Sequence, residues 1–415
     1  MARKSVLPQL IQTSQERNML DNVRALSTVY RAAKSMTAIA LTELPEPGNV
    51  AEALQLVNVP VPRPSRHQVA IQLFASSLHV DEIYAAQGTA LGRFFGPKRA
   101  SANSPYVMGT LVSGVVVATG QDATRFNVGD EVIVVPNELG ENGSWATYRC
   151  VSHDYLMLKP PALSHVEAAA ATLSGCVAWG AINTARIEKG DHCLVVGASG
   201  AVGSMMVQFL KSKGAIVTGV CSGANADLVR TLGADHTIDY NVTSFGSQGK
   251  NTYDRVFDLV GGRDIEAAAY RILKRKGRFV TIVGPIRHIG ERKLSRGEFL
   301  LGVGHVTCRS IATRLRGPRY RFCASLPRNN AYAAMLSIAK HNIRSPIEAE
   351  IPFDLPQIRA AIRTLMSHRT RGRIVINFLT NEKSSRPETS SRPEVHLKQS
   401  LFRHKTKFNQ DTVII

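Results

Sequence analysis

The feature that most constrains the fold is a regular alternation of short apolar runs and amphipathic segments between residues 192 and 284. The apolar runs predict strands, and the 3.6-residue periodicity between them predicts helices. Strands and helices that alternate at this spacing form a parallel, doubly wound α/β sheet. The expected strands are 192–197, 215–221, 236–240, 255–261 and 277–284, with helices at 201–214, at 225–233 and after residue 261 as far as about Leu273.

The rest of the chain has a different pattern, of short strands and turns. Short strands and turns follow one another from Met36 to about residue 160, and strand patterns return at 347–355 and 372–378. The simplest architecture is therefore discontinuous, with a β-rich first domain that the C-terminal part of the chain completes. The expected divisions are an N-terminal extension (1–35), a β-rich domain (36–160), a Rossmann-type nucleotide-binding domain (161–310), a return to the first domain (311–380) and a disordered basic tail (381–415).

The first strand of the α/β pattern ends in the glycine loop GASGAVG, residues 197–203. The glycines stand three apart, so the backbone can approach a pyrophosphate and the helix can pack close to the strand. The free N–H groups and dipole of the helix then face the phosphates. The alternative is a tight strand-to-helix turn without a ligand; the flanking strand and helix favour the phosphate site. The residues expected to hold the cofactor here are Ser199, Gly200, Ala201, Val202 and Gly203.

The end of the second strand indicates which cofactor is bound. NAD sites usually have an acidic residue there for the ribose hydroxyls, whereas this chain has Cys221-Ser222-Gly223 and no acid before Asp227. A small, neutral, hydroxyl-bearing end leaves room for a 2′-phosphate, so NADPH is favoured over NADH. Tyr240 could add a phenol donor to that phosphate; the alternative is ordinary packing at a strand end.

Several segments resemble the zinc-free quinone oxidoreductase branch of the medium-chain dehydrogenase/reductases. The resemblance extends from about Met36 to Phe378, and it implies a GroES-like first domain, a Rossmann second domain and an active site in the cleft between them. The late segments 317–322 and 343–353 are most similar to the mitochondrial, reticulon-interacting members. The motifs are ASSLHVDEIYAAQG, TRFNVGDEV, KPPALSHVEAAAA, AWGAI, GASGAVG, VCS, LGADHTIDY and RGRIVINF.

The resemblance also implies roles for single residues. It places Ser222 and Tyr240 at the 2′-phosphate, and it places Asn225 where some relatives have a lysine. The remaining cofactor candidates from the resemblance are Val283, Tyr320 and Gly372.

Zinc-dependent relatives hold their catalytic metal at positions that correspond to His79, Thr110 and Leu173. Threonine and leucine cannot complete a tetrahedral nitrogen and sulfur site, so no metal is expected. Without a Lewis acid to polarise a carbonyl, hydride transfer to an electron-poor carbon is favoured. We therefore expect an NADPH-dependent oxidoreductase that reduces a quinone or an α,β-unsaturated carbonyl. The alternatives are an enoyl-thioester reductase (CoA or carrier protein) and a catalytically weak scaffold or RNA-binding protein on the same fold.

Two residues depart from the family pattern in the expected cleft. His79 stands where zinc-free relatives usually have asparagine, and Leu111 stands where they often have aspartate. His79 could hydrogen-bond the substrate carbonyl or donate a proton, because the pKa of histidine lies near working pH. The favoured alternative is that His79 only replaces an amide that positions the cofactor ribose or a loop. The loss of the acid at Leu111 indicates an unusual substrate or weakened activity.

The charge is concentrated in one segment. The chain carries a net charge of +19, and residues 271–330 hold 15 Lys or Arg against only Glu291 and Glu298. Such a field attracts anions, which include phosphorylated cofactors, acidic lipids, an acidic partner and RNA; the alternative is a solvated basic face. Few aromatics apart from Tyr320 and Phe322 lie among these charges, so nucleic-acid stacking is poorly supported. The oligomeric state is not indicated.

The N-terminal segment and the cysteines indicate the cellular compartment. Residues 1–35 carry six Lys or Arg with Ser and Thr, as in a mitochondrial transit peptide, although Glu16 and Asp21 count against one. A mitochondrial location is therefore expected, with the cytoplasm as the alternative. The six cysteines are scattered without a CxxC pair, which indicates a reducing compartment. The apolar run 168–182 is too short to cross a bilayer and is expected in the core.

Overall fold

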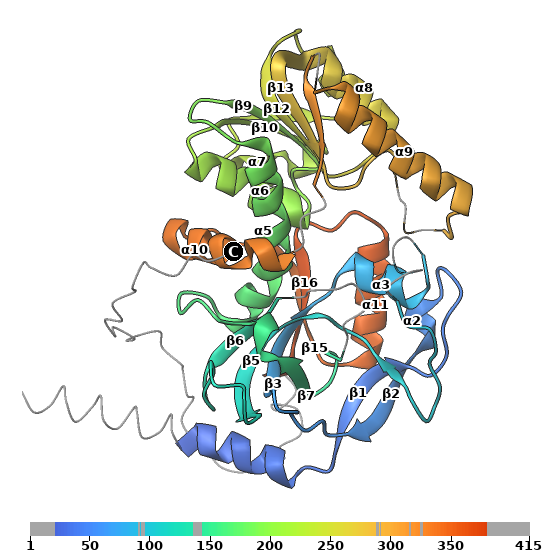
Figure 1. The fold of residues 1–415 in the computed structure, drawn as a ribbon, viewed down its shortest axis with the longest axis vertical. Coiled ribbons are helices and arrows are strands. Elements are labelled where there is room, and N and C mark those ends of the chain that lie inside the picture. The colour runs from blue at the N-terminus through green and yellow to red at the C-terminus, as the bar shows by residue number, and fades with distance from the viewer. Residues whose placement is uncertain are drawn as a thin grey trace, which may run out of the picture.

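The chain folds into two lobes, each built on one large sheet, with helix α5 (His165–Ala185) between them (Figure 1). This computed structural model describes residues 21–89, 92, 96–135, 143–287, 290, 292–314, 317–323 and 327–379.

The upper lobe in Figure 1 contains a six-stranded parallel sheet in the order β11-β10-β9-β12-β13-β14. The predicted parallel, doubly wound sheet is confirmed, with strand and helix ends shifted by a few residues. Its strands are β9 (His192–Val196), β10 (Ile216–Cys221), β11 (His236–Asp239), β12 (Tyr253–Asp258), β13 (Leu273–Thr281) and β14 (Arg319–Phe322). Its helices are α6 (Ala201–Ser212), α7 (Ala226–Thr231), α8 (Arg263–Ile272) and α9 (Arg296–Ala312), with short 3₁₀ turns at Gly223–Asn225 and Phe245–Ser247.

The burial of the central strands explains the apolar sequence pattern of this lobe. Central strands of a parallel sheet are covered on both faces, so their side chains are apolar almost without interruption. In β9, the side chains from Cys193 to Val196 are all buried. Helix α6 buries Met205, Met206 and Phe209 on one side, as its sequence period predicts.

The lower lobe contains a seven-stranded sheet and a three-stranded sheet. Strand β16 pairs antiparallel with β3, with Val375 opposite Ser77, so the C-terminal part of the chain completes the first lobe as predicted. The larger sheet consists of β3 (Gln68–Ser77), β5 (Leu111–Thr119), β6 (Glu131–Val134), β7 (Tyr148–Ser152), β8 (Leu156–Leu158), β15 (Ile347–Pro352) and β16 (Arg373–Asn377). The smaller sheet consists of β1 (Ser35–Leu41), β2 (Leu54–Pro60) and β4 (Tyr106–Val107). The helices are α2 (Val50–Ala53), α3 (Val80–Ala86), α11 (Leu355–Met366) and a 3₁₀ turn at His153–Tyr155.

Helix α5 is the apolar run expected in the core. Its N-terminus has a capping box, in which Ser164 and Glu167 each bond the other's backbone N–H. Most residues between Ala168 and Ala185 are buried against both lobes, which confirms the prediction for this run. In the part of the chain with assigned structure, no helix combines the length and the apolar character needed to cross a bilayer.

The domain boundary predicted at residue 311 is wrong. Strand β14 pairs with β13 and is the edge strand of the α/β sheet. Helix α10 (Pro327–His341) then packs against α5, and Met335 and Ile338 join the core of the α/β lobe. The chain therefore returns to the lower lobe only near β15. The arginines of β14 hid this strand from the sequence pattern.

The division at residue 35 also needs correction. Residues 21–32 form a helix that lies against the lower lobe (Figure 1). Tyr30 is 1% exposed, and its hydroxyl donates a hydrogen bond to the Pro62 carbonyl at 2.7 Å. The Ser27 hydroxyl donates to the Val117 carbonyl at 3.0 Å. This part of the expected extension belongs to the lobe. The predictions of a transit peptide and of a disordered tail concern residues 1–20 and 381–415, which lie outside the described residues.

Candidate active site

The glycine loop forms a tight turn between β9 and α6. Gly197 has a φ of +85°, which favours glycine. A Cβ atom on Gly203 would lie 2.1 Å from the Gly197 carbonyl oxygen, so only glycine lets the helix approach the strand. A Cβ atom on Gly200 would meet only that oxygen, at 3.5 Å, so the space in front of Gly200 is open. Among the described residues, no side chain caps the helix at Gly200, so the amides of Ala201 and Val202 are available to a phosphate.

We call the glycine loop at 197–203 and the start of α6 the cradle. The turn after β10 forms its other side. The Asn225 side-chain amide donates a hydrogen bond to the Ser199 hydroxyl at 3.2 Å, which joins the two loops expected to hold the cofactor. The Tyr240 side chain is 60% exposed at the end of β11, so packing at a strand end does not account for it. Ser222, Asn225 and Tyr240 thus surround one turn at the carboxyl edge of the sheet, where open α/β sheets bind ligands.

Sequence reasoning missed an acidic group at this turn. Strands β10 and β11 pair in register, so that Cys221 lies opposite Asp239. One carboxylate oxygen of Asp239 lies 2.5 Å from where a Cβ atom on Gly223 would be, and the other accepts the Asn241 N–H at 2.9 Å. A negative charge therefore borders the expected 2′-phosphate position. Matching the ends of the two neighbouring strands would have revealed this residue.

The three cofactor candidates from the family resemblance lie in different places. Val283 follows β13 at the carboxyl edge of the sheet, where its side chain fills the space beside Gly261. Tyr320 is 1% exposed, and its ring packs between Phe279 and His305 in the core. The prediction for Tyr320 is therefore wrong, because this side chain serves packing within the sheet's hydrophobic core.

Gly372 joins the two lobes at the cradle. It forms an isolated parallel bridge with Gly200, and a Cβ atom on it would lie 2.1 Å from the Pro346 carbonyl oxygen. The next residue, Arg373, is 4% exposed, and its guanidinium donates to the Leu78 carbonyl at 3.1 Å. The same guanidinium donates twice to the Ser174 hydroxyl, at 2.7 and 2.9 Å. A continuous chain of contacts therefore leads from the cradle to the residue before His79.

His79 caps the N-terminus of α3. Its Nδ1 accepts the Asp81 backbone N–H at 3.2 Å, and its side chain is 15% exposed. Burial, and secondarily the charge of Arg373, holds the pKa of His79 well below its usual value. The imidazole is therefore neutral, with its proton on Nε2. Such a ring can donate a hydrogen bond to a carbonyl, but it is a poor source of a proton.

Glu82 is a second group that sequence reasoning missed. One of its carboxylate oxygens accepts the Thr110 backbone N–H at 2.7 Å, and the other has no hydrogen-bond partner in the described structure. Burial raises the pKa of Glu82 to about 7, against the opposing effects of the Thr110 N–H and the charge of Arg373. Burial likewise lowers the pKa of Arg373 to about 10. Glu82 thus fixes the start of β5, where Leu111 is fully buried.

A further question is whether residues at this site could bind a metal ion. The described residues contain no cluster of three or more His, Cys, Asp or Glu side chains that could hold an ion. At the position of a second zinc ligand, Thr110 instead uses its backbone N–H to bind Glu82.

Comparisons with known proteins match this architecture. The family model for the alcohol dehydrogenase GroES-like domain matches residues 65–161, and the model described as zinc-binding dehydrogenase matches residues 232–376. The mouse protein "NAD(P)H oxidoreductase RTN4IP1, mitochondrial" is 33% identical over 333 residues, which cover 75% of this chain and 82% of the relative. An Arabidopsis thaliana chloroplast envelope quinone oxidoreductase homolog is 33% identical over 219 residues, covering 51% of this chain and 64% of the relative.

The chain belongs to the quinone oxidoreductase branch of the medium-chain dehydrogenase/reductase superfamily. The solved quinone oxidoreductase from Coxiella burnetii has the same fold, with a TM-score of 0.66 and 24% identity over 83% of this chain and 99% of that one. As a member of this branch, the protein is an oxidoreductase that uses a nicotinamide cofactor.

Proposed function

We propose that this oxidoreductase transfers hydride from NADPH to a quinone or an α,β-unsaturated carbonyl. The observation that carries the proposal is the bridge between Gly200 and Gly372. Gly372 is followed by Arg373, which binds the carbonyl of Leu78, the residue before His79, so contacts link the glycine loop of one lobe to the segment that carries His79 in the other. Cofactor and acceptor can then meet at the junction of the two lobes, where family members have their active site.

The chain's own groups bind and orient the reactants. The free amides at the start of α6 hold the pyrophosphate, while Ser222, Asn225 and Tyr240 are placed for the 2′-phosphate. NADPH, when bound, supplies the hydride. The Nε2–H of neutral His79 donates a hydrogen bond to the acceptor's carbonyl oxygen as negative charge develops there. Arg373 acts as a positioning residue, because it holds the backbone before His79 through the Leu78 carbonyl.

We also propose that the protein acts in mitochondria, because its relatives named RTN4IP1 are described as mitochondrial.

The activity is tested by following oxidation of NADPH and NADH with quinones, conjugated enones and enoyl thioesters. We expect turnover with quinones or enones, and about a hundredfold loss of kcat in His79→Phe, which removes the donor. His79→Gln, which keeps an N–H donor, should retain more activity than His79→Phe. The exposed His341 on α10 provides the control, His341→Asn, which should behave as the native protein.

Turnover with enoyl thioesters alone would replace the proposed substrate class with thioesters. Cofactor binding without turnover on any acceptor would overturn the proposed activity. Equal activity of His79→Phe and the native protein would refute the role of His79.

The preference for NADPH has its own test at Asp239. If a 2′-phosphate lies beside this carboxylate, Asp239→Asn removes a repulsion and should tighten NADPH binding about tenfold, with little change for NADH. If Asp239 instead holds ribose hydroxyls, the same substitution weakens NADH binding. Fluorescence titration of both cofactors distinguishes these results, and the second would reject NADPH as the preferred cofactor.

A further inference from the structure

Three carboxyl groups are buried in the described part of the chain, those of Glu82, Asp258 and Glu266. Two of them have partners for both oxygens. The oxygens of Asp258 accept hydrogen bonds from the backbone after β12 and from the Thr281 hydroxyl, the latter at 2.8 Å. Glu82 differs, because its Oε2 has no hydrogen-bond partner within the described structure.

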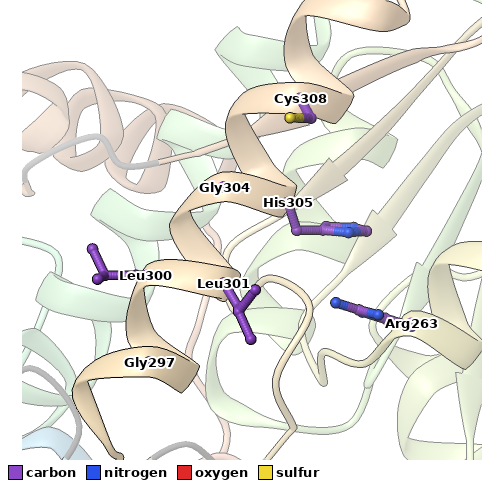
Figure 2. A pocket seen from close by; sticks show the side chains of 7 residues that line it. All are labelled: Arg263, Gly297, Leu300, Leu301, Gly304, His305 and Cys308. Atoms are coloured by element: carbon purple, nitrogen blue, oxygen red, sulfur yellow. The ribbon is translucent and has the colours of Figure 1, made fainter.

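Glu266 shows how a buried carboxylate is normally compensated. It lies on α8, and its two oxygens are bound by His305 at 2.7 Å and by Arg309 at 2.5 Å. Figure 2 shows His305 reaching from α9 toward the start of α8, where Arg263 lies. Buried carboxylates usually need such partners, because an unpaired charge in the interior is costly.

The Glu82 carboxyl has no comparable partner. The Arg373 guanidinium acts on it only from a distance, because it donates to the Ser174 hydroxyl and the Leu78 carbonyl instead. Burial therefore favours the neutral acid and raises the pKa of Glu82 to about 7. Since Oε1 accepts the Thr110 N–H, the proton of the neutral acid lies on Oε2. Glu82 thus stores a proton in the interior of the lower lobe.

The side chain of Thr110 connects this proton with the surface of the lobe. Its hydroxyl lies next to the carboxyl, since the Thr110 side chain is the largest effect that opposes the rise in the pKa of Glu82. Thr110 is half-buried, whereas Gly109 and Leu111 on either side of it are buried. Glu82 follows His79 by one turn of α3, and its N–H donates to the His79 carbonyl at 3.2 Å. The pair therefore lies beside the residue that the proposed function assigns to the acceptor's carbonyl oxygen.

Reduction of a quinone or an enone consumes a proton as well as a hydride, and neutral His79 is a poor source of a proton. On the basis of the proposed function, we propose that Glu82 supplies this proton through the Thr110 hydroxyl. As hydride adds to the electrophilic carbon, the displaced π electrons of the acceptor move to its carbonyl oxygen. That oxygen takes the proton of the Thr110 hydroxyl, and the Thr110 oxygen takes the proton from Oε2 of Glu82. The carboxylate that is left regains a proton from water after the product leaves.

The pH dependence of kcat tests this role. In the native protein kcat should fall about tenfold per pH unit above about 7, as Glu82 ionises. Glu82→Gln should lower kcat about a hundredfold at pH 6, with little change in KM, and should abolish the fall above pH 7. Thr110→Val, which keeps the N–H but lacks the hydroxyl, should show the same loss, and Thr110→Ser should restore most of the activity. The exposed Glu43 provides the control, Glu43→Gln, which should behave as the native protein.

The other charged groups around Glu82 have separate outcomes. Arg373 of β16 favours the carboxylate, and Arg149 of β7 donates to the Thr110 carbonyl at 3.1 Å. Asp81 precedes Glu82 on α3, and its side chain is 47% exposed. Asp81→Asn should leave the fall in kcat above pH 7 in place. If Asp81→Asn removes that fall and Glu82→Gln does not, the proton comes from Asp81 and the proposal is wrong.

Infrared difference spectroscopy detects the stored proton without turnover. The spectrum of the native protein minus that of Glu82→Gln at pH 6 should contain the carbonyl band of a protonated carboxyl. This band should disappear by pH 8 and should shift in Thr110→Val, which lacks the neighbouring hydroxyl. Absence of the band would overturn the proposal, as would native kcat in Glu82→Gln. If the band is present but no acceptor is reduced, the proposed function itself is refuted, and the donor role of Glu82 with it.

Discussion

Replacing Glu82 with glutamine should stabilise the protein at pH 8 and have much less effect at pH 5. Burial raises the pKa of Glu82 from 4.5 to about 7, so folding disfavours its ionised form. Below pH 4.5 the carboxyl is protonated in both folded and unfolded chains, and no penalty arises. As pH rises toward 7 the unfolded chain ionises first, and stability is lost. Above pH 7 the loss is complete, at about 3 kcal/mol for this difference in pKa.

Glutamine has the same shape and keeps an oxygen that can accept the Thr110 N–H, but it cannot ionise. The gain of about 3 kcal/mol at pH 8 corresponds to a melting temperature roughly 6 °C higher for a lobe of this size. At pH 5 the gain falls to about 1 kcal/mol. Scanning fluorimetry of the native protein and Glu82→Gln between pH 5 and pH 8 measures both values, and other titrating groups cancel in the difference.

A control of opposite sign is available in Glu298, at the start of α9. Its hydrogen bonds from Arg292 and Ser295 hold the pKa of Glu298 down at about 2, so its contribution to stability is present above pH 4.5 and is lost as pH falls toward 2. Glu298→Gln should therefore lower the melting temperature at both pH 5 and pH 8. The reasoning for Glu82 fails if Glu82→Gln gives the same change at both pH values, or if it destabilises the protein at pH 8.

Two further predictions concern the cradle and the thiols. Gly203→Ala would place a Cβ atom 2.1 Å from the Gly197 carbonyl oxygen and should lower the free energy of unfolding by about 2–3 kcal/mol. In Gly200→Ala the new Cβ atom would lie 3.5 Å from the same oxygen, so this variant should keep native stability and lose cofactor affinity. Denaturant titration and cofactor fluorescence check the pair, and equal stabilities would contradict the close approach of α6 to β9. A brief exposure to a limiting amount of maleimide should label the exposed Cys308 first, because burial raises the pKa of the partly buried Cys150 to about 11 and of the buried Cys176 to about 12. Mass spectrometry that finds Cys150 or Cys176 modified first would contradict this order.

The sequence predicted the parts of the fold that local pattern determines. The α/β alternation and the glycine turn depend on residues close together in the chain, and they were placed within a few positions. Strand β14 was missed because RYRF alternates charged and aromatic residues, as an edge strand with one solvated side does. Tyr320 was expected at the cofactor from the family resemblance, but its ring faces the core, a burial that depends on how β14 pairs with β13.

The missed site residues depend on contacts between distant segments. Asp239 borders the turn after β10 only through strand register. Glu82 meets Thr110 only once α3 packs beside the start of β5. Both positions lie within segments that carry the family resemblance, ASSLHVDEIYAAQG and LGADHTIDY, but nothing in those segments marks either acid as a site residue. His79 was identified from its departure from the family pattern, but its neutral state depends on burial and on Arg373.

The packing of Tyr30 makes the helix at 21–32 a structural part of the lower lobe. Its ring meets Tyr148 at a centroid distance of 5.1 Å and lies under the Arg63 guanidinium, in a cluster that also contains Val61. A protease that cut at residue 35 would leave a tyrosine-sized hole there, at a cost of about 3–5 kcal/mol, within the range of a whole protein's stability. The helix at 21–32 also lies on the lobe rather than apart from it. Removal of the segment that carries Tyr30 would therefore destabilise the lower lobe.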